Sequence, residues 1–226
     1  MTKELDVRIE NLSYTARFSR PAFDLWQDGG TIMKNLYDAL APFGVTLQSI
    51  QATPTLPNMS TPLVTIGIGN SGSLKFAYDR LEFTFNDFTL DVFQSLPRLF
   101  SSTTHWLRDA VSNFQFASHE FNYFNHSYIK EWTTEDLLAS VNPRMLESGG
   151  LPVGHGLIFH HTIPERKWLT HLIVDKSSHL PNALFLGLGI IVTQDGIDYD
   201  SFLVEGRSYL ASMLRELDLA FPELSQ

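Results

Sequence analysis

The chain has 226 residues, of which 43% are hydrophobic, and carries a net charge of −9 without a single cysteine. This length and apolar content suffice to bury a large core, which excludes a disordered chain. The acidic balance, with lysine and arginine scattered singly, argues against binding to nucleic acid or to an anionic membrane. The lack of cysteine excludes disulfide scaffolds and thiolate metal sites.

The N-terminal segment, Met-Thr-Lys-Glu-Leu-Asp, lacks the basic and then apolar profile of a signal peptide. No apolar run reaches the roughly 18 residues of a membrane span. Together with the lack of cysteine, these observations predict a cytoplasmic protein that has no membrane segment.

The first half of the chain alternates strand and helix patterns. Residues 12–19 alternate apolar with polar side chains, which is the period of a half-exposed strand. A helix is predicted from an N-cap at Thr31 to the stop signals Pro42 and Gly44. Further along, the pattern predicts strands at 45–52, 63–70, 73–78 and 81–88, a loop at 53–62, and a long helix at 90–111.

The second half repeats this order. The pattern predicts strands at 116–130, 155–162, 168–175 and 183–192, a turn at 148–150, a short helix at 133–141 and a last helix after a turn at 194–196. The last helix is expected to bury a stripe formed by Leu203, Leu210, Met213, Leu214, Leu217 and Phe221.

The run from Ala183 to Val192 has no polar side chain, so it is predicted to be a central strand that is covered on both faces. Gly187 and Gly189 point to the same side. Glycines two residues apart weaken a strand unless a helix, an aromatic ring or a ligand lies close against the bare backbone. A phosphate-binding loop needs a third glycine at a helix start, so close packing beneath a helix or across a subunit interface is the favoured interpretation.

Short turns between strands predict an antiparallel sheet, with long helices packed on one face. The fold class is therefore α+β, with strand-helix-strands-helix halves at 1–112 and 113–226 that form one internally duplicated unit. This order resembles the layout of the TATA-box-binding-like and helix-grip folds, in which a curved sheet cradles a long helix. The resemblance is one of topology, and it carries no functional motif.

Five histidines fall within 25 residues, at positions 155, 160, 161, 171 and 179. A hairpin turn centred between Glu165 and Arg166 places His160 opposite His171, at about 5 Å between side chains. Two imidazoles on one sheet face can bind a metal or relay a proton. The alternative is a cross-strand pair that is hydrogen-bonded to backbone or water. Asp195, Asp198 and Asp200 precede the last helix and are expected to cap it.

Ile158, Leu169 and Ile173 share the face of the two histidines. Because one layer of helices covers only one side of a sheet, this apolar side must meet a second subunit, another protein or a small apolar ligand. The sequence therefore predicts a non-enzymatic interaction module, forming a homodimer, without a cofactor. The alternative is a small-molecule binder or enzyme that uses His160 and His171 in a cavity between the sheet and the long helices.

Overall fold

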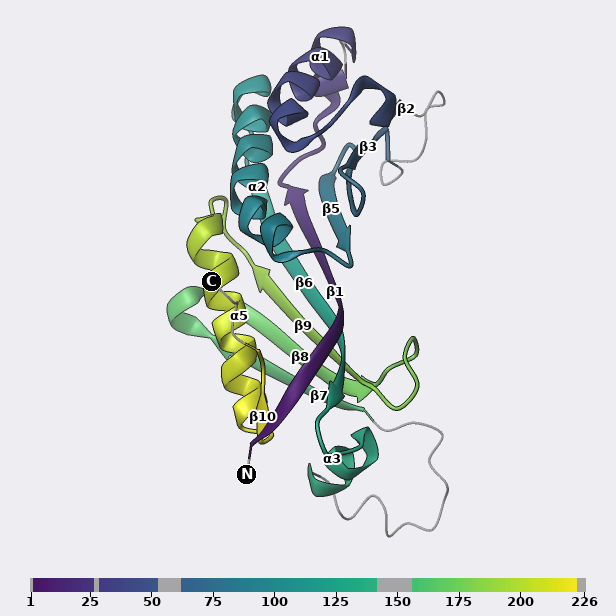
Figure 1. Ribbon diagram of the computed structural model, residues 1–226. Coiled ribbons are helices and arrows are strands. Elements are labelled where there is room, and N and C mark those ends of the chain that lie inside the picture. Colours follow the sequence, from purple (N-terminus) through teal and green to yellow (C-terminus); the bar gives the residue numbers. More distant parts are fainter. Residues whose placement is uncertain (1, 27–28, 53–61, 142–155, 223–226) are drawn as a thin grey trace. The chain divides into compact units, whose positions relative to one another are not determined.

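A computed structural model describes residues 2–26, 29–52, 62–141 and 156–222 (Figure 1). The strands are β1 (Lys3–Phe18), β2 (Ile50–Ala52), β3 (Val64–Ile68), β4 (Gly72–Phe76), β5 (Arg80–Asn86), β6 (Phe116–Ile129), β7 (Leu157–Ile163), β8 (Trp168–Lys176), β9 (Leu184–Val192) and β10 (Leu219–Ala220). The α-helices are α1 (Gly29–Leu40), α2 (Leu90–Ala110), α3 (Thr134–Val141) and α5 (Tyr199–Arg215), and the 3-10 helices are η1 (Phe23–Trp26), η2 (Ala41–Phe43), η3 (Leu47–Ser49) and η4 (Pro164–Arg166). The predicted turn at 148–150, residues 53–61 of the predicted loop, His155 and the side chain of Thr31 lie outside the described residues.

The strands form a ten-stranded sheet in the order β2-β3-β4-β5-β1-β6-β9-β8-β7, and β10 pairs with β1. Four neighbouring pairs are antiparallel hairpins or meanders, namely β2 with β3, β3 with β4, β4 with β5, and β7 with β8. The short strand β10 runs parallel to β1. The predicted α+β class is confirmed, whereas internal duplication of the two halves stays a prediction.

Contacts divide the chain into two compact units that interleave along the sequence. Unit 1 comprises residues 1–11, 122–190 and 204–226, and unit 2 comprises residues 12–121 and 191–203. Strands β1, β6 and β9 and helix α5 therefore contribute residues to both units. The predicted halves at 1–112 and 113–226 stay a prediction about topology. Each site described below lies within one unit.

An aromatic core stabilises unit 2. Alternation along β5 buries Leu81, Phe83 and Phe85, as the period of two predicts. The ring of Phe83 lies 4.9 Å from that of Phe100 on α2, and the ring of Tyr14 on β1 lies 4.7 Å from Phe100. The face of α2 that carries Phe100 thus covers the inner face of β1 and β5, while α1 packs against α2.

Several predicted boundaries are wrong. Strand β1 begins at Lys3 rather than at residue 12, and α1 begins at Gly29, so Thr31 lies inside the helix and is not its N-cap.

Two further boundaries differ for local reasons. Within the predicted strand at 45–52, the Ser49 hydroxyl donates to the Thr46 carbonyl (2.7 Å) and accepts from the Thr46 N–H (3.1 Å). These bonds close a 3-10 turn and leave only the three residues of β2 as strand. The last helix ends at Arg215, because Asp218 adopts a left-handed φ of 56° and the chain then continues into β10.

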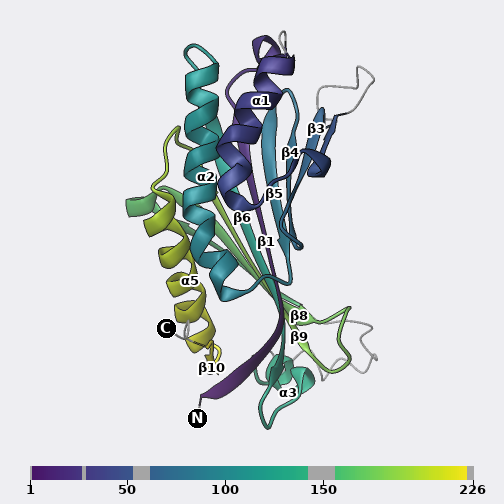
Figure 2. The same cartoon turned by 45° about the horizontal axis from the view of Figure 1, so that its top comes forward.

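In unit 1, α5 lies along one side of the strands β7, β8 and β9 (Figures 1 and 2). The side chains of β9 that face this helix are at most 3% exposed, as predicted, and include Leu184, Leu186, Leu188 and Ile190. A Cβ on Gly206 of α5 would lie 3.2 Å from Cδ1 of Ile190, so this glycine allows a close approach of the helix to the sheet. Within the described ranges, no helix has both the length and the apolar character that crossing a membrane requires.

Candidate functional site

The residues predicted for a binding face lie on the β7–β8 hairpin of unit 1. Three cross-strand pairs share one side of it, namely Ile158 with Ile173, His160 with His171, and Thr162 with Leu169. We call these six side chains the β7–β8 face. The predicted register is confirmed, since His160 and His171 pair directly. Lys167 follows η4 with a left-handed φ of 54°, which closes the hairpin at this register.

The β7–β8 face points away from α5. The hydroxyl of Tyr209 on α5 lies 3.1 Å from Oγ1 of Thr170 and 2.9 Å from Nδ1 of His161. Because side chains alternate along a strand, His160 and His171 point to the opposite side of the sheet. The alternative interpretation, which placed this histidine pair in a cavity between the sheet and the long helices, is therefore wrong about their position.

The β7–β8 face is open and combines three aliphatic side chains with two histidines and a threonine. Ile158 is 60% exposed and Leu169 is 49% exposed, although both are large aliphatic residues. His160 is also exposed, whereas His171 and Ile173 are half-buried. The rings of the two histidines are 6.3 Å apart between centroids. None of the six side chains is a lysine, an arginine or a carboxylate, and the carboxylate of Asp175 lies at one end of the same side of β8, beyond Ile173. The six side chains can therefore pack on an apolar surface while Asp175 stays at the edge of the contact.

The glycine pair of β9 makes room for rings from the neighbouring strands. A Cβ on Gly189 would lie 1.9 Å from Cε1 of His171, so the imidazole lies directly on the bare backbone. A Cβ on Gly187 would lie 3.2 Å from Cδ1 of Phe124 on β6. Of the predicted alternatives, an aromatic ring rather than a helix covers these glycines. This packing fixes His171 on the sheet, while His160 stays exposed.

A third histidine on the same side of the sheet, His126 on β6, was not predicted. The Nδ1 of His126 lies 2.7 Å from Oγ of Ser177, and this oxygen accepts the backbone N–H groups of His179 (3.1 Å) and Leu180 (2.8 Å). Because these amides occupy the serine lone pairs, its hydroxyl hydrogen points to His126. Burial, together with nearby His179, lowers the pKa of His126. A serine held in this way caps a turn and is a poor nucleophile.

Unit 2 contains a buried polar network that the sequence did not indicate. The Tyr14 hydroxyl lies 2.8 Å from Nδ1 of His119 and 2.6 Å from the Tyr199 hydroxyl. The other ring nitrogen of His119, Nε2, lies 3.2 Å from the carbonyl oxygen of Asp195. All three side chains are at most 5% exposed.

The direction of these hydrogen bonds follows from the carbonyl at one end. Since the oxygen of Asp195 can only accept, Nε2 of His119 carries the proton and Nδ1 accepts from Tyr14. The Tyr14 oxygen then accepts from Tyr199. Burial lowers the pKa of His119 to about 4. Burial also raises the pKa of Tyr14 and of Tyr199 above the usual tyrosine value. All three groups are therefore neutral at pH 7.

A polar pocket of about 390 Å³ lies beside this network in unit 2. It is lined by Ser101, Thr104, His105 and Arg108 from α2 and by Asp195, Gly196, Ile197 and Tyr199 from the segment before α5 and its first residue. Asp195 does not cap α5 as predicted, because its Oδ1 accepts from the Phe116 N–H (2.7 Å) and pairs with Arg108 (3.2 Å). Asp198 does cap it, accepting from the Ser201 hydroxyl (2.6 Å) and from backbone N–H groups.

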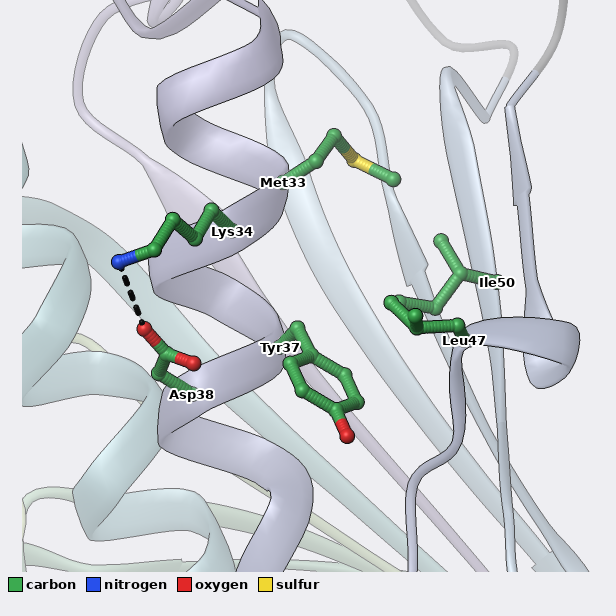
Figure 3. A pocket seen from close by; sticks show the side chains of 6 residues that line it. All are labelled: Met33, Lys34, Tyr37, Asp38, Leu47 and Ile50. Atoms are coloured by element: carbon green, nitrogen blue, oxygen red, sulfur yellow. Dashed lines mark hydrogen bonds and ion pairs between the residues drawn. The ribbon is translucent and has the colours of Figure 1, made fainter.

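An open apolar groove of about 550 Å³ lies elsewhere in unit 2 (Figure 3). Met33 and Tyr37 on α1 point toward Leu47 and Ile50, which lie on η3 and β2. The charged neighbours Lys34 and Asp38 pair with each other at 3.3 Å. Leu47 is 70% exposed, but it is a single side chain at the rim of the groove.

A local pattern in the sequence indicated the β7–β8 face, but none indicated the buried network. The histidine pair is 11 positions apart and is set by one hairpin. By contrast, Tyr14 is separated from His119 by 105 residues and from Tyr199 by 185 residues. The signal in the sequence was limited to Tyr14, which occupies an apolar position of an alternating strand, whereas Tyr199 begins helix α5. In the part of the chain that the structure describes, no group of three or more histidine or carboxylate side chains is placed to hold a metal ion.

The chain was compared with known proteins. No protein-family model matches it. No curated protein matches its sequence either.

Proposed function

We propose that this protein is a non-enzymatic interaction module that forms a homodimer through the β7–β8 face. The observation that supports the proposal is the exposure of Ile158 (60%) and Leu169 (49%) on opposite strands of one hairpin, on either side of the histidine pair. Exposed apolar groups that lie together on a sheet mark a surface that another body covers. The lack of cysteine supports a cytoplasmic location.

A second copy is the partner that the charge distribution favours. The chain carries 25 acidic and 16 basic residues, so two copies repel each other over most of their surface. None of the six side chains of the β7–β8 face is a lysine, an arginine or a carboxylate, and Asp175 lies beyond Ile173 at one end of the same side of the sheet. Two such faces can pack at about 10 Å separation, and a twofold axis across the strands places the two copies of Asp175 at opposite ends of the contact. A twofold axis in the contact plane makes this surface self-complementary.

The expected affinity is modest. Covering the exposed parts of Ile158 and Leu169 in both copies contributes on the order of 3–6 kcal/mol, since a fully buried aliphatic side chain contributes about 1.5–3 kcal/mol and roughly half of each is already covered. Association costs about 4–15 kcal/mol in lost freedom of motion. Ile173 and the imidazoles must therefore contribute as well, and we expect a dissociation constant of about 1 µM or weaker.

Sedimentation velocity over a range of micromolar concentrations tests the proposal. The wild type is expected to shift from monomer to dimer as concentration rises, and the double substitution Ile158→Asp with Leu169→Asp is expected to stay monomeric. Leu47→Asp is the matched control, because Leu47 is 70% exposed and lies in unit 2, outside the face.

Two results would contradict the proposal. One is a wild type that remains monomeric at every concentration, which is expected if the β7–β8 face binds another protein or a small apolar ligand instead of a second copy. The other is a variant with both Ile158→Asp and Leu169→Asp that still forms a dimer, which places the contact on a different surface.

A further inference from the structure

We infer that His160 and His171 of two copies together form a binding site for a divalent transition metal of the zinc class. The inference rests on the proposed homodimer, because one copy supplies only two imidazoles. Zinc requires three or four ligands, and the described part of a single chain places no third histidine or carboxylate with this pair.

The position of the pair within the face brings the two copies' histidines together. His160 and His171 form the middle of the three cross-strand pairs, with Ile158 and Ile173 before them and Thr162 and Leu169 after them. A twofold axis that lies in the contact plane and passes through the middle of the face places the histidine pair of one copy opposite the histidine pair of the other copy. The result holds whether the axis runs along the strands or across them. Four imidazoles then meet between the flanking pairs, which contribute Ile158, Ile173 and Leu169 as aliphatic side chains.

One histidine of each pair is fixed and the other can adapt. His171 lies on the backbone of Gly189, where any Cβ would overlap its ring at 1.9 Å, so β9 holds this imidazole in place. His160 is exposed, and its ring centroid lies 6.3 Å from that of His171. Two nitrogens bound to one tetrahedral zinc at about 2.0–2.1 Å lie about 3.3 Å apart. A rotation of the free His160 side chain can bring its nitrogen toward that separation.

The chemistry of the face selects the class of metal. Imidazole nitrogen suits zinc, copper and nickel, whereas calcium and magnesium require oxygen ligands. No carboxylate is present among the six side chains of the face. The aliphatic side chains of Ile158 and Leu169 surround the site and exclude water when the copies associate, which strengthens binding of the ion.

Zinc titration of metal-free protein tests the inference, with ZnCl₂ as the probe, isothermal titration calorimetry for stoichiometry and sedimentation velocity for the oligomeric state. We expect one zinc ion for two chains and at least a tenfold decrease in the dimer dissociation constant. His160→Gln is expected to abolish both effects while leaving the fold intact, because His160 is exposed. His105→Gln, on the exposed side of α2 in unit 2, is the control for adventitious binding.

The outcomes separate this inference from the proposed function. Zinc bound once per chain, or binding that is lost with His105→Gln but kept with His160→Gln, overturns the metal site. A wild type that dimerises to the same extent with and without zinc, and binds none, also overturns the metal site, while the homodimer stands. A wild type that is monomeric in both conditions, and unaffected by Ile158→Asp, overturns the homodimer and the metal site with it.

Discussion

Burial of His119 is expected to make the protein sensitive to acid, and the size of the effect follows from its surroundings. The side chain is 1% exposed, and loss of hydration of the charged imidazolium lowers its pKa to about 4. In an unfolded chain the histidine pKa is about 6.5. At about 1.4 kcal/mol for each pKa unit, the difference corresponds to about 3 kcal/mol of stability.

The sign of the effect follows from proton binding. Above about pH 6.5 the imidazole is neutral in both states and contributes no pH dependence. Between about pH 6.5 and pH 4 the unfolded chain binds a proton that the folded protein does not, so stability falls as the pH falls. Below about pH 4 the loss is complete, because the folded protein then binds the proton as well and the bonds of His119 to Tyr14 must rearrange.

The assay is urea unfolding followed by tryptophan fluorescence between pH 7 and pH 4, with His119→Gln as the test variant. Glutamine keeps one acceptor and one donor but does not titrate. We expect it to lower stability at pH 7 by about 1–2 kcal/mol through poorer geometry. We also expect the variant to lack the loss of about 3 kcal/mol in unfolding free energy that is expected for the wild type between pH 7 and pH 4. His105→Gln is the exposed control. Equal pH slopes for wild type and His119→Gln would refute the reasoning.

Two further predictions concern packing and hydrogen bonding. Tyr14→Phe is expected to lower the free energy of unfolding in urea by about 2–4 kcal/mol, because Nδ1 of His119 and the Tyr199 hydroxyl both lose Tyr14 as their partner in a buried site. Tyr199→Phe removes one of these two bonds, so we expect it to cost about half as much. Gly189→Ala is expected to lower the free energy of unfolding by about 1–3 kcal/mol and to shift the His171 resonances in an NMR spectrum, since the new methyl group overlaps the imidazole. The same substitution in a His171→Ala background is expected to cost less. Equal costs in both backgrounds would show that the ring is not the cause.

Local patterns predicted the elements whose partners are near in sequence. Alternation with a period of two predicted the buried side of β5, and the apolar run of residues 183–192 predicted the central strand β9. The length of one turn predicted that His160 pairs with His171. Each of these depends on the geometry of a single strand or hairpin, which is fixed by a few consecutive dihedral angles.

Other features depended on contacts between distant segments. The strand β10 replaces the predicted end of the last helix because Lys3 pairs with Leu219, at the other end of the chain. The glycines of β9 were visible in the sequence, but the rings that lie on them come from Phe124 and His171 of other strands.

The sequence by itself determined the α+β class, most element positions and the side of one hairpin that carries Ile158, Leu169 and Ile173 with the histidine pair, since hydrophobic periodicity and turn chemistry act over a few residues. Only the tertiary structure decided that this side faces away from α5, and that Tyr14, His119 and Tyr199 share buried hydrogen bonds. The physical reason is that burial and hydrogen-bond partners are set by which segments pack together. That choice depends on the summed packing of the whole chain, which no local pattern contains.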